Sequence, residues 1–565
     1  MINDLRVRAV YQESLGKLYL EFLKENHKDP NTKEFSKFVE FSDVDAENGV
    51  TSWKDIFKNI SEVRRYVLDR FPEEVEQYTF TEHDFGTVDY YEKVSEEIKK
   101  YKKFVVSTAV NNKPVDIEFL ASLKQYAKEN NAKLLWVVSH DVKSTKRECK
   151  WNLDPALRCG IIVTDDLILN DNVMISGIVA SAKQINPLTG LPKLCPREDK
   201  SIIFPGCKQV LQHIAEIEPR YRTPHKVVCM GAVTVPDYNE DRIMSGRTSY
   251  IAEKDHQMGA LVVELEDEKR FHIRLVQAAE DGSFTDMGMI YSSDKPVAIT
   301  TDAILVLGDL HVGGHGLNTL LFEDKLKFIS TNPYITEVIV HDIENAASVS
   351  HHEENDFIKR IMRYKNGEDS LIEEGNDIVR CINALTELPN IKQVSIVNSN
   401  HDRHVEKWLS NFGFFRNRDT KNAEVGLELA LALTKGTVTS AVQYLVENLT
   451  TEKLSHPEKI KWIGRDESYK RYGVELGRHG DEGKNGAKGS LRTYATCLYN
   501  AVIGHSHSAG VQQKVFQVGT GSNMDMGYNH GLSSWTNTDC LVYKDGGKQL
   551  IDFIPTKDGG YTYRV

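Results

Sequence analysis

The first 75 residues carry apolar side chains at helical spacing. One run shows this spacing at five positions: Leu15, Leu18, Tyr19, Phe22 and Leu23. After a polar linker, the segment TSWKDIFKNISEVRRYVLDRF (51–71) repeats the pattern, with Thr51 or Ser52 as a plausible N-cap. The pattern therefore predicts a small helical domain over residues 1–75.

Two interpretations of this helical region remain open. Its second run carries basic side chains that we expect to be exposed: Lys58, Arg64, Arg65 and Arg70. Short helices with an exposed basic face are compatible with a DNA-binding helix-turn-helix module. A helical interaction domain explains the same pattern without invoking a motif, and we prefer it.

The spacing of apolar residues along the chain changes after an acidic, aromatic connector at residues 76–100. The segments KKFVVSTAV (102–110), VDIEFLASLKQYAKENNA (115–132) and KLLWVVSHD (133–141) predict a strand, a helix and a strand. Further apolar runs predict strands at 161–169, 202–204, 226–235 and 259–265. Residues 101–295 are therefore predicted to form a middle α/β domain, in which no side chains have a spacing typical of catalysis.

The last third, residues 296–565, differs because its apolar strands end in polar side chains. The run Ala303–Leu307 leads into Asp309 and His311, and EVIVHDIEN (337–345) leads into Asp342. KQVSIVNSNHDRH (392–404) and NAVIGHSHSAG (500–510) repeat the arrangement, and the loop RHGDEG adds a further histidine. Open α/β sheets bind ligands at the carboxyl ends of their strands. The side chains delivered there are Asp309, His311, Asp342, Asn400, His401, Asp402, His479, His505 and His507.

Composition narrows the class of protein without changing this picture. The 565 residues are 40% hydrophobic and 27% charged, which excludes a collagen-like or wholly disordered chain. No apolar stretch is long enough to span a membrane, and the N-terminus lacks the apolar core of a secretory signal. The 8 cysteines form no CxxC pair, so we expect reduced thiols in a cytoplasm. A net charge of −12 means that a nucleic-acid partner would need local basic patches and metal ions.

The order D-x-H, D, N-H-D, H and G-H-x-H resembles the calcineurin-like metallophosphoesterase family over about residues 300–530. The resemblance implies a two-sheet αββα-type sandwich for residues 296–565, with two divalent metal ions side by side at the strand ends. It implies that the first metal is held by Asp309, His311 and His507. It implies that the second is held by Asn400, His479 and His505. Asp342 would bridge both metals, His401 would face the scissile phosphate, and Asp402 would orient the His401 ring.

Elementary chemistry is consistent with these implied roles. Two dications about 4 Å apart need a shared anionic ligand, and water bound between them becomes a nucleophile near neutral pH. A histidine beside the metals can assist the leaving oxygen. The mixed Asp, Asn and His ligands exclude a thiolate site, and we expect manganese, with zinc or iron as alternatives.

The chain departs from the family pattern at two positions. His341 and Ser399 stand where the family usually has glycine, before the bridging aspartate and before the asparagine. Either the loops are shaped differently here, or His341 adds a contact to substrate. The stretch between Asp342 and Asn400 is also long, and its His351 and His352 are either extra ligands or, as we prefer, solvated residues.

Three functions fit this pattern. The first is a nuclease that hydrolyses DNA phosphodiester bonds with Arg403, Lys484 and Lys488 as substrate-binding residues. On segments such as MGAVTVPDY (230–238), the whole chain resembles phage-encoded nucleases that degrade host DNA, which would place it in the host cytoplasm. The second is a protein or nucleotide phosphomonoesterase, and the third is a non-catalytic DNA-handling scaffold. The loop GYNHGLSSW (527–535) is compatible with a homo-oligomer interface, a substrate platform or a plain connection.

Overall fold

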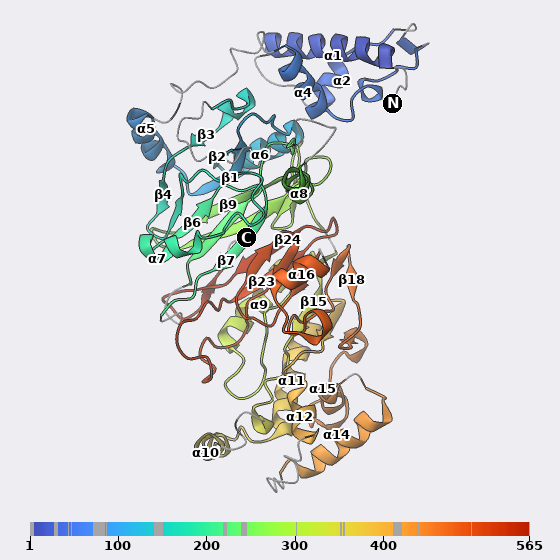
Figure 1. The fold of residues 1–565 in the computed structure, drawn as a ribbon. Helices are drawn as coiled ribbons and strands as arrows, with labels where there is room; N and C mark the ends of the chain where they lie inside the picture. The colour runs from blue at the N-terminus through green and yellow to red at the C-terminus, as the bar shows by residue number, and fades with distance from the viewer. Residues whose placement is uncertain are drawn as a thin grey trace. The chain divides into compact units, whose positions relative to one another are not determined.

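A computed structural model describes residues 5–563, except 27–31, 43–44, 47, 72–84, 86, 141–150, 218–222, 239–245, 301, 351–352, 354–355, 411–420, 439 and 499. The chain forms two compact units, coloured along the sequence in Figure 1. Unit 1 comprises Met1–Val210 and Val227–Ala298, and unit 2 comprises Leu211–Lys226 and Ile299–Val565. Helices and mixed sheets occur in both units, so the predicted α/β fold class is confirmed.

Unit 1 contains the predicted helical and middle regions. Its helices are α1 (Leu5–Asn26), α2 (Thr32–Phe38), η1 (Trp53–Asp55), α4 (Ile60–Arg70), α5 (Val88–Ile98), α6 (Ile117–Glu129), η3 (Pro155–Cys159), η4 (Pro192–Leu194), α7 (Cys195–Glu198) and α8 (Arg247–Asp255). Its strands are β1 (Lys103–Val110), β2 (Ala132–Ser139), β3 (Ile161–Val163), β4 (Leu167–Asn170), β5 (Val173–Ile175), β6 (Ser201–Phe204), β9 (Gly259–Leu265), β10 (Phe271–Gln277), β11 (Phe284–Asp286), β12 (Met289–Tyr291) and β13 (Val297–Ala298). Strands β7 (Gln209–His213) and β8 (Lys226–Met230) lie where the chain passes from one unit to the other.

The predicted strand–helix–strand segment is confirmed. Strands β1 and β2 are parallel and joined by α6, and the sheet runs in the order β10-β9-β1-β2-β3. Apolar residues of α1, α4 and η1 belong to the same hydrophobic core as this sheet, as shown by Leu15, Trp53, Val63 and Trp136. Residues 76–84 and 86 of the expected connector lie outside the described residues, and the rest of it contains α5.

One expectation for the helical region is confirmed and one is corrected. Ser52 is an N-cap as predicted, but it caps only the short 3-10 helix η1, and Asn59 caps a separate helix, α4, within the run 51–71. Each cap accepts a hydrogen bond from a backbone N–H that would otherwise have no partner, which fixes a separate start. Arg64, expected to be exposed, is buried and forms an ion pair with Asp154. It is therefore unavailable to a nucleic-acid backbone.

Unit 2 contains the strands that carry the candidate chemistry. Its strands are β14 (Ala303–Val306), β15 (Ile335–His341), β16 (Gln393–Val397), β17 (Ile460–Ile463), β18 (Lys470–Arg471), β19 (Val474–Glu475), β20 (Ala501–Ile503), β21 (Gly510–Gln512), β22 (Val515–Gln517), β23 (Thr538–Val542), β24 (Lys548–Asp552), β25 (Ile554–Pro555) and β26 (Tyr561–Thr562). Its helices are α9 (Thr319–Thr331), η5 (Ala347–Val349), α10 (Phe357–Asn366), α11 (Leu371–Thr386), α12 (His404–Ser410), α14 (Ala423–Lys435), α15 (Ala441–Tyr444), η6 (Leu445–Leu449), η7 (Pro457–Lys459), η8 (Lys484–Gly486) and α16 (Leu491–Cys497).

Two sheets of unit 2 deliver the polar side chains. The first runs β17-β16-β15-β14-β23-β24, with β14 to β17 parallel. Because parallel strands end at the same edge, this sheet brings the loops after β14, β15 and β16 together. In the second sheet β19, β20 and β22 are parallel neighbours, and the loops after β19 and β20 carry the remaining histidines.

A small helical subdomain packs against one of these loops, the loop that follows β15. Helices α11, α12, α14 and α15 share an apolar core with the loop that follows β15 (Figure 1). Its members include Ala346, Leu371, Trp408 and Leu429. The long stretches before and after β16 therefore form a folded insertion that packs against the loop carrying Asp342.

No helix in the described part of the chain combines the length and apolar content needed to cross a membrane.

Candidate metal centre

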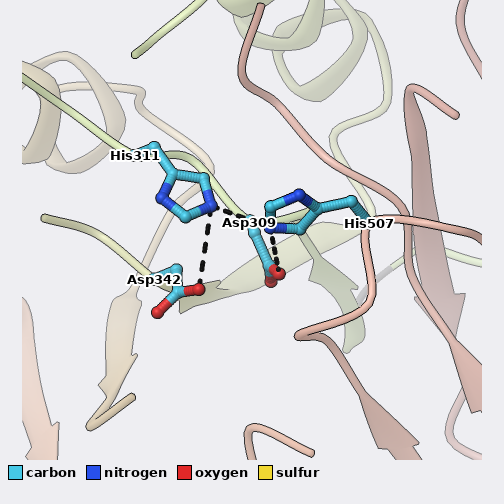
Figure 2. Close-up of side chains that lie close together, drawn as sticks. All are labelled: Asp309, His311, Asp342 and His507. Carbon is cyan, nitrogen blue, oxygen red and sulfur yellow. Dashed lines mark hydrogen bonds and ion pairs between the residues drawn. The ribbon is translucent and has the colours of Figure 1, made fainter. Parts of the chain in front are cut away.

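Four of the predicted residues form a buried cluster at the strand ends of unit 2. Figure 2 shows Asp309, His311, Asp342 and His507 facing one another. One donor atom from each lies within 4.8 Å of the donor atoms of the others. All four side chains are buried. Carboxylate oxygens and imidazole nitrogens gathered in this way are ligands for a divalent metal, so this cluster could hold a metal ion.

The contacts within the cluster fit a cation better than a hydrogen-bond network. The Nε2 atoms of His311 and His507 lie 2.9 Å apart, and the His507 Nε2 lies 3.3 Å from Asp309 Oδ2. Asp309 Oδ1 is buried and accepts no hydrogen bond from any described residue. A buried carboxylate oxygen without a donor is costly unless a cation neutralises it. The donor set therefore fits a bound divalent metal.

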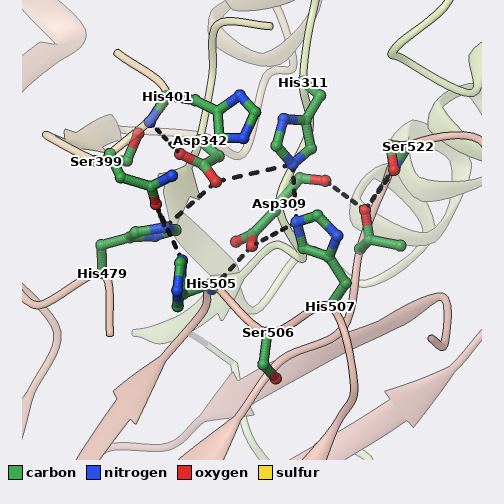
Figure 3. A network of polar contacts seen from close by, with 12 residues as sticks. Asp309, His311, Asp342, Ser399, His401, His479, His505, Ser506, His507 and Ser522 are labelled. Carbon is green, nitrogen blue, oxygen red and sulfur yellow. Dashed lines mark hydrogen bonds and ion pairs between the residues drawn. The ribbon is translucent and has the colours of Figure 1, made fainter. Parts of the chain in front are cut away.

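A second group of donors meets the first at Asp342. Asn400 Oδ1 lies 3.0 Å from His479 Nε2 and 3.0 Å from His505 Nδ1. His479 Nε2 is also 3.2 Å from Asp342 Oδ2, and the same oxygen is 3.7 Å from His311 Nε2. Figure 3 shows Asp342 between His479 and His311. The structure thus brings all seven sequence-predicted ligands together, with one carboxylate oxygen between two groups.

Neighbouring charges oppose the effect of burial on the pKa at Asp342 and His479, and act with it at His311. Burial by itself would raise the pKa of Asp342, but His479, His401 and His311 together hold that pKa well below its usual range. Burial would lower the pKa of His479, yet Asp342 and Asp309 raise it to about 9. Burial and the neighbouring His401 lower the pKa of His311 well below its ordinary value. The lowered pKa keeps Asp342 ionised, and its negative charge would attract a cation.

Four of these residues have left-handed backbone conformations. The φ angles are 52° at His311, 42° at Asp342, 75° at His505 and 58° at His507. Such angles cost a non-glycine residue of order 1–3 kcal/mol, and they persist only where surrounding contacts hold them. Here the His311 amide donates to Asp342 O at 2.8 Å and the His505 amide donates to Asp309 Oδ2 at 2.8 Å. Strain of this kind clusters at functional sites.

The two residues that stand in place of the usual glycines do not themselves require a glycine-like backbone. Neither His341 nor Ser399 has a positive φ angle. Ser399 exchanges hydrogen bonds with Asp402, since its amide donates to the Asp402 carboxylate at 3.0 Å and its hydroxyl accepts from the Asp402 amide at 3.3 Å. His341 is fully buried, and burial lowers its pKa to about 4. The alternative in which His341 contacts substrate is therefore wrong, because its ring has no exposed surface.

His401 and Asp402 lie beside the donors, and the contacts of Asp402 differ from those expected. The His401 amide donates to Asp342 Oδ1 at 3.3 Å, and its ring packs 4.4 Å from the His311 ring centroid. The Asp402 carboxylate accepts hydrogen bonds from the amides of Ser399 and Glu344, at 3.0 and 3.2 Å. None of its described hydrogen bonds reaches the His401 ring. Asp402 therefore ties together the loops after β15 and β16, which corrects its expected role of orienting that ring.

A cavity of about 520 Å³ opens onto the centre. Asp342, Asn400, His401, His505 and His507 line its floor. Its remaining lining includes Lys488 and the aromatic residues Tyr528 and Trp535. The Trp535 ring lies 4.2 Å from the His507 ring, at a steep interplanar angle of 79°. The cavity is therefore lined by candidate metal ligands, a lysine and two aromatic rings.

Of the three predicted substrate-binding residues, one lines the cavity. Lys488 lines the cavity, whereas Lys484 is exposed in η8 and is not part of the lining. Arg403 pairs with Glu482 at 3.2 Å and is half-exposed outside the cavity. His351 and His352 lie outside the described residues.

Sequence reasoning missed a buried ion pair beneath the first ligand loop. Lys325 Nζ lies 2.5 Å from Asp539 Oδ1, and the same oxygen accepts a hydrogen bond from the Gly308 amide at 2.8 Å. Both charged side chains are fully buried. They position the backbone immediately before Asp309. In the sequence, Lys325 stands in an amphipathic helix and Asp539 in an apolar strand. Neither pattern indicates that the two side chains form an ion pair.

With this geometry established, comparison with known proteins identifies a relative. The chain is 28% identical over 482 residues to "Protein A1" of Escherichia phage T5. The match covers 81% of this chain and 83% of that protein. No family model matches the chain. No solved structure matches it either. The relative is consistent with a phage origin, and the match is longer than unit 2, so it extends beyond the metal centre.

Proposed function

We propose that the chain is a metal-dependent nuclease that hydrolyses DNA phosphodiester bonds. The observation that carries the proposal is the position of Asp342 Oδ2, 3.2 Å from His479 and 3.7 Å from His311. A single carboxylate between two groups of ligands is what a pair of divalent ions requires, because it relieves their mutual repulsion. Phosphoester hydrolysis is the reaction class most directly served by such a pair.

The proposed ligands divide into two sets around Asp342. Asp309, His311 and His507 would hold one ion, and Asn400, His479 and His505 the other. When bound, the two ions would supply an activated water and neutralise charge on the phosphate. Oxygen and imidazole donors suit manganese, zinc or iron, and we propose manganese.

The protein's own residues would bind the phosphate and assist the leaving group. His401 lines the cavity beside Asp342 and would donate a proton to the departing oxygen. Lys488 would attract the polyanion by its positive charge. The buried floor would exclude bulk water from the reacting atoms, which strengthens each of these electrostatic contacts.

DNA is favoured over a small phosphomonoester by two features. The cavity carries exposed aromatic surface at Tyr528 as well as a lysine, which suits a nucleotide more than a bare phosphate. The likeness to a phage protein also extends beyond unit 2, so the chain outside the metal centre is part of what the two proteins share.

The proposal is tested by supplying the purified chain with manganese or with EDTA. Native plasmid DNA, heat-denatured plasmid DNA and p-nitrophenyl phosphate serve as parallel substrates. We expect manganese-dependent loss of plasmid DNA in one or both of its forms, with slow monoester turnover. Fast monoester turnover with intact plasmid would replace the nuclease by a phosphomonoesterase, and salt-sensitive DNA binding without turnover would replace it by a scaffold.

A further inference from the structure

Two aromatic residues share the cavity with the candidate metal centre. Tyr528 is 51% exposed, and its ring centroid lies 6.1 Å from that of Trp535. Trp535 in turn packs against His507, one of the clustered donors. Trp535 therefore lies between Tyr528 and the candidate ligand His507, and all three residues line one cavity of about 520 Å³.

We propose that Tyr528 and Trp535 bind the base of an unpaired nucleotide whose phosphate lies at the metal centre. The substrate is then single-stranded DNA, or a frayed end, rather than an intact duplex. This inference rests on the proposed nuclease function and adds its substrate class.

The physical reason is where bases lie in the two forms of DNA. In a duplex the bases are stacked inside, and an enzyme reaches one only by taking it out of the stack. A base can contact Tyr528 while its own phosphate meets His401 only when the nucleotide is unpaired, because both residues line one small cavity. Stacking on an aromatic ring tolerates any base, so no sequence preference is expected.

The loop that carries the aromatic pair is held in place before any ligand binds. Asn523 donates from its side chain to His315 O at 2.7 Å and from its amide to Gly316 O at 2.9 Å. Asn529 donates to Met524 O at 2.7 Å within the loop. At the other end, Ser533 and Glu216 exchange backbone hydrogen bonds of 2.9 Å. A preorganised surface loses little freedom on binding, which favours a role in recognition.

The positive charge of Lys488 in the cavity suits a DNA strand that passes through it. Lys488 lines the wall formed by the Gly-rich loop after β19 and is exposed to solvent. A cation there would meet a phosphate next to the one at the metal centre. Aromatic stacking together with a basic wall is the combination that single-strand-binding grooves use.

The decisive experiment compares two manganese-dependent substrates with the same leaving group. Thymidine 5′-(p-nitrophenyl) phosphate carries a base, and methyl p-nitrophenyl phosphate does not. We expect wild-type kcat/KM to favour the thymidine ester, and Tyr528→Ala to reduce that preference by roughly 5- to 100-fold, the usual worth of one stacked base. Tyr528→Phe keeps the ring and should keep the preference. Tyr364→Ala, at a tyrosine 71% exposed on α10 and outside the cavity lining, is the matched control.

Binding gives a readout that does not depend on turnover. With calcium in place of manganese, fluorescence anisotropy of an end-labelled thymidine decamer should show tighter binding than its duplex form. Tyr528→Ala should remove most of that difference, and Tyr364→Ala should leave it.

The outcomes separate the two proposals. Hydrolysis of both esters without preference, or equal loss of single- and double-stranded DNA, overturns the aromatic site and leaves the nuclease standing. A preference that survives Tyr528→Ala also overturns it. No hydrolysis of either ester by manganese-loaded protein overturns both proposals.

Discussion

Gly504 and Asp309 are packed so closely that no side chain fits between them. A methyl group on Gly504 would overlap Asp309 Oδ1 and would lie 3.4 Å from His341 Cβ. Gly504 follows β20, whereas Asp309 follows β14 and His341 ends β15, so this contact joins loops of two different sheets. The glycine of the G-H-x-H motif is therefore required by space and not by backbone angle.

Gly504→Ala should displace Asp309 and lower the hydrolytic rate by about 100-fold or more, since small misplacements of reacting groups have costs of this size. Hydrolysis of methyl p-nitrophenyl phosphate and metal content by elemental analysis are the measurements. Gly464→Ala is the control, because its nearest neighbour is 3.8 Å away and the methyl group fits. Equal effects of the two substitutions would contradict the steric argument.

Asp342→Asn should reduce bound metal from two ions per chain to one or none. The neutral amide no longer relieves the repulsion between two cations, so we expect activity to fall by about 10³-fold or more. Asp466→Asn is the matched control, because the Asp466 side chain is 98% exposed. Two tightly bound ions in Asp342→Asn would show that this carboxylate is not shared.

His401→Ala should leave both metal ions in place and lower kcat by about 10²–10⁴-fold, the usual contribution of a general acid. The reason is that the contact of His401 with Asp342 is made by its backbone amide, which the substitution keeps. His456→Ala, at an exposed histidine paired with Glu458, should have no effect. If His401→Ala instead lost a metal ion, His401 would have to be counted among the ligands.

Asp402→Ala should lower stability as well as activity. It removes acceptors for the Ser399 and Glu344 amides, and each lost hydrogen bond in a buried site costs of order 1 kcal/mol. We expect the free energy of unfolding to fall by about 2 kcal/mol, measured by denaturant titration, with Asp402→Asn intermediate. Lost activity at unchanged stability would indicate that Asp402 acts on the His401 ring after all.

His213 predicts a dependence of stability on pH. It is buried and donates from Nδ1 to Ala509 O at 2.7 Å. Burial, followed by the charge of Lys226, lowers its pKa to about 4, against the opposing effects of Asp552 and Glu216. A folded pKa below the unfolded value of about 6.5 means that its contribution is complete above pH 6.5 and is lost as the pH falls towards 4.

His213→Asn keeps a polar contact but does not titrate. Between pH 8 and 4.5, the wild type should lose about 2.5 kcal/mol more unfolding free energy than this variant. Urea unfolding at the two pH values measures the difference, with His456→Asn as the exposed control. Parallel losses in wild type and His213→Asn would assign the acid sensitivity to other groups.

The basic residues show the limits of reading charge from sequence. Arg64 was expected on an exposed face, but its partner Asp154 lies 90 residues away in the chain and both are buried. Arg363 on α10 likewise pairs with Glu353 at 2.6 Å, while apolar residues of the same helix such as Phe357 are 74% exposed. A charge pattern along one helix cannot reveal which face meets the rest of the fold.

The sequence by itself determined the strands of the last third and the side chains that follow them. Both are local properties: a run of β-branched residues favours a strand, and the residues after it must leave at the strand's end. Asp309, Asp342, Asn400 and His505 could be chosen as donors on that basis.

Only the tertiary structure decided which of these donors meet, and what surrounds them. Asp342 comes to lie between His311 and His479 because loops that follow strands of two different sheets converge there, and these loops are far apart in the sequence. The same long-range packing buries His341 and places Tyr528 in the lining of the cavity. It also brings the Asp402 carboxylate to the backbone amide of Glu344. Local sequence carries no information on these contacts, because their free energy comes from surfaces that exist only after folding.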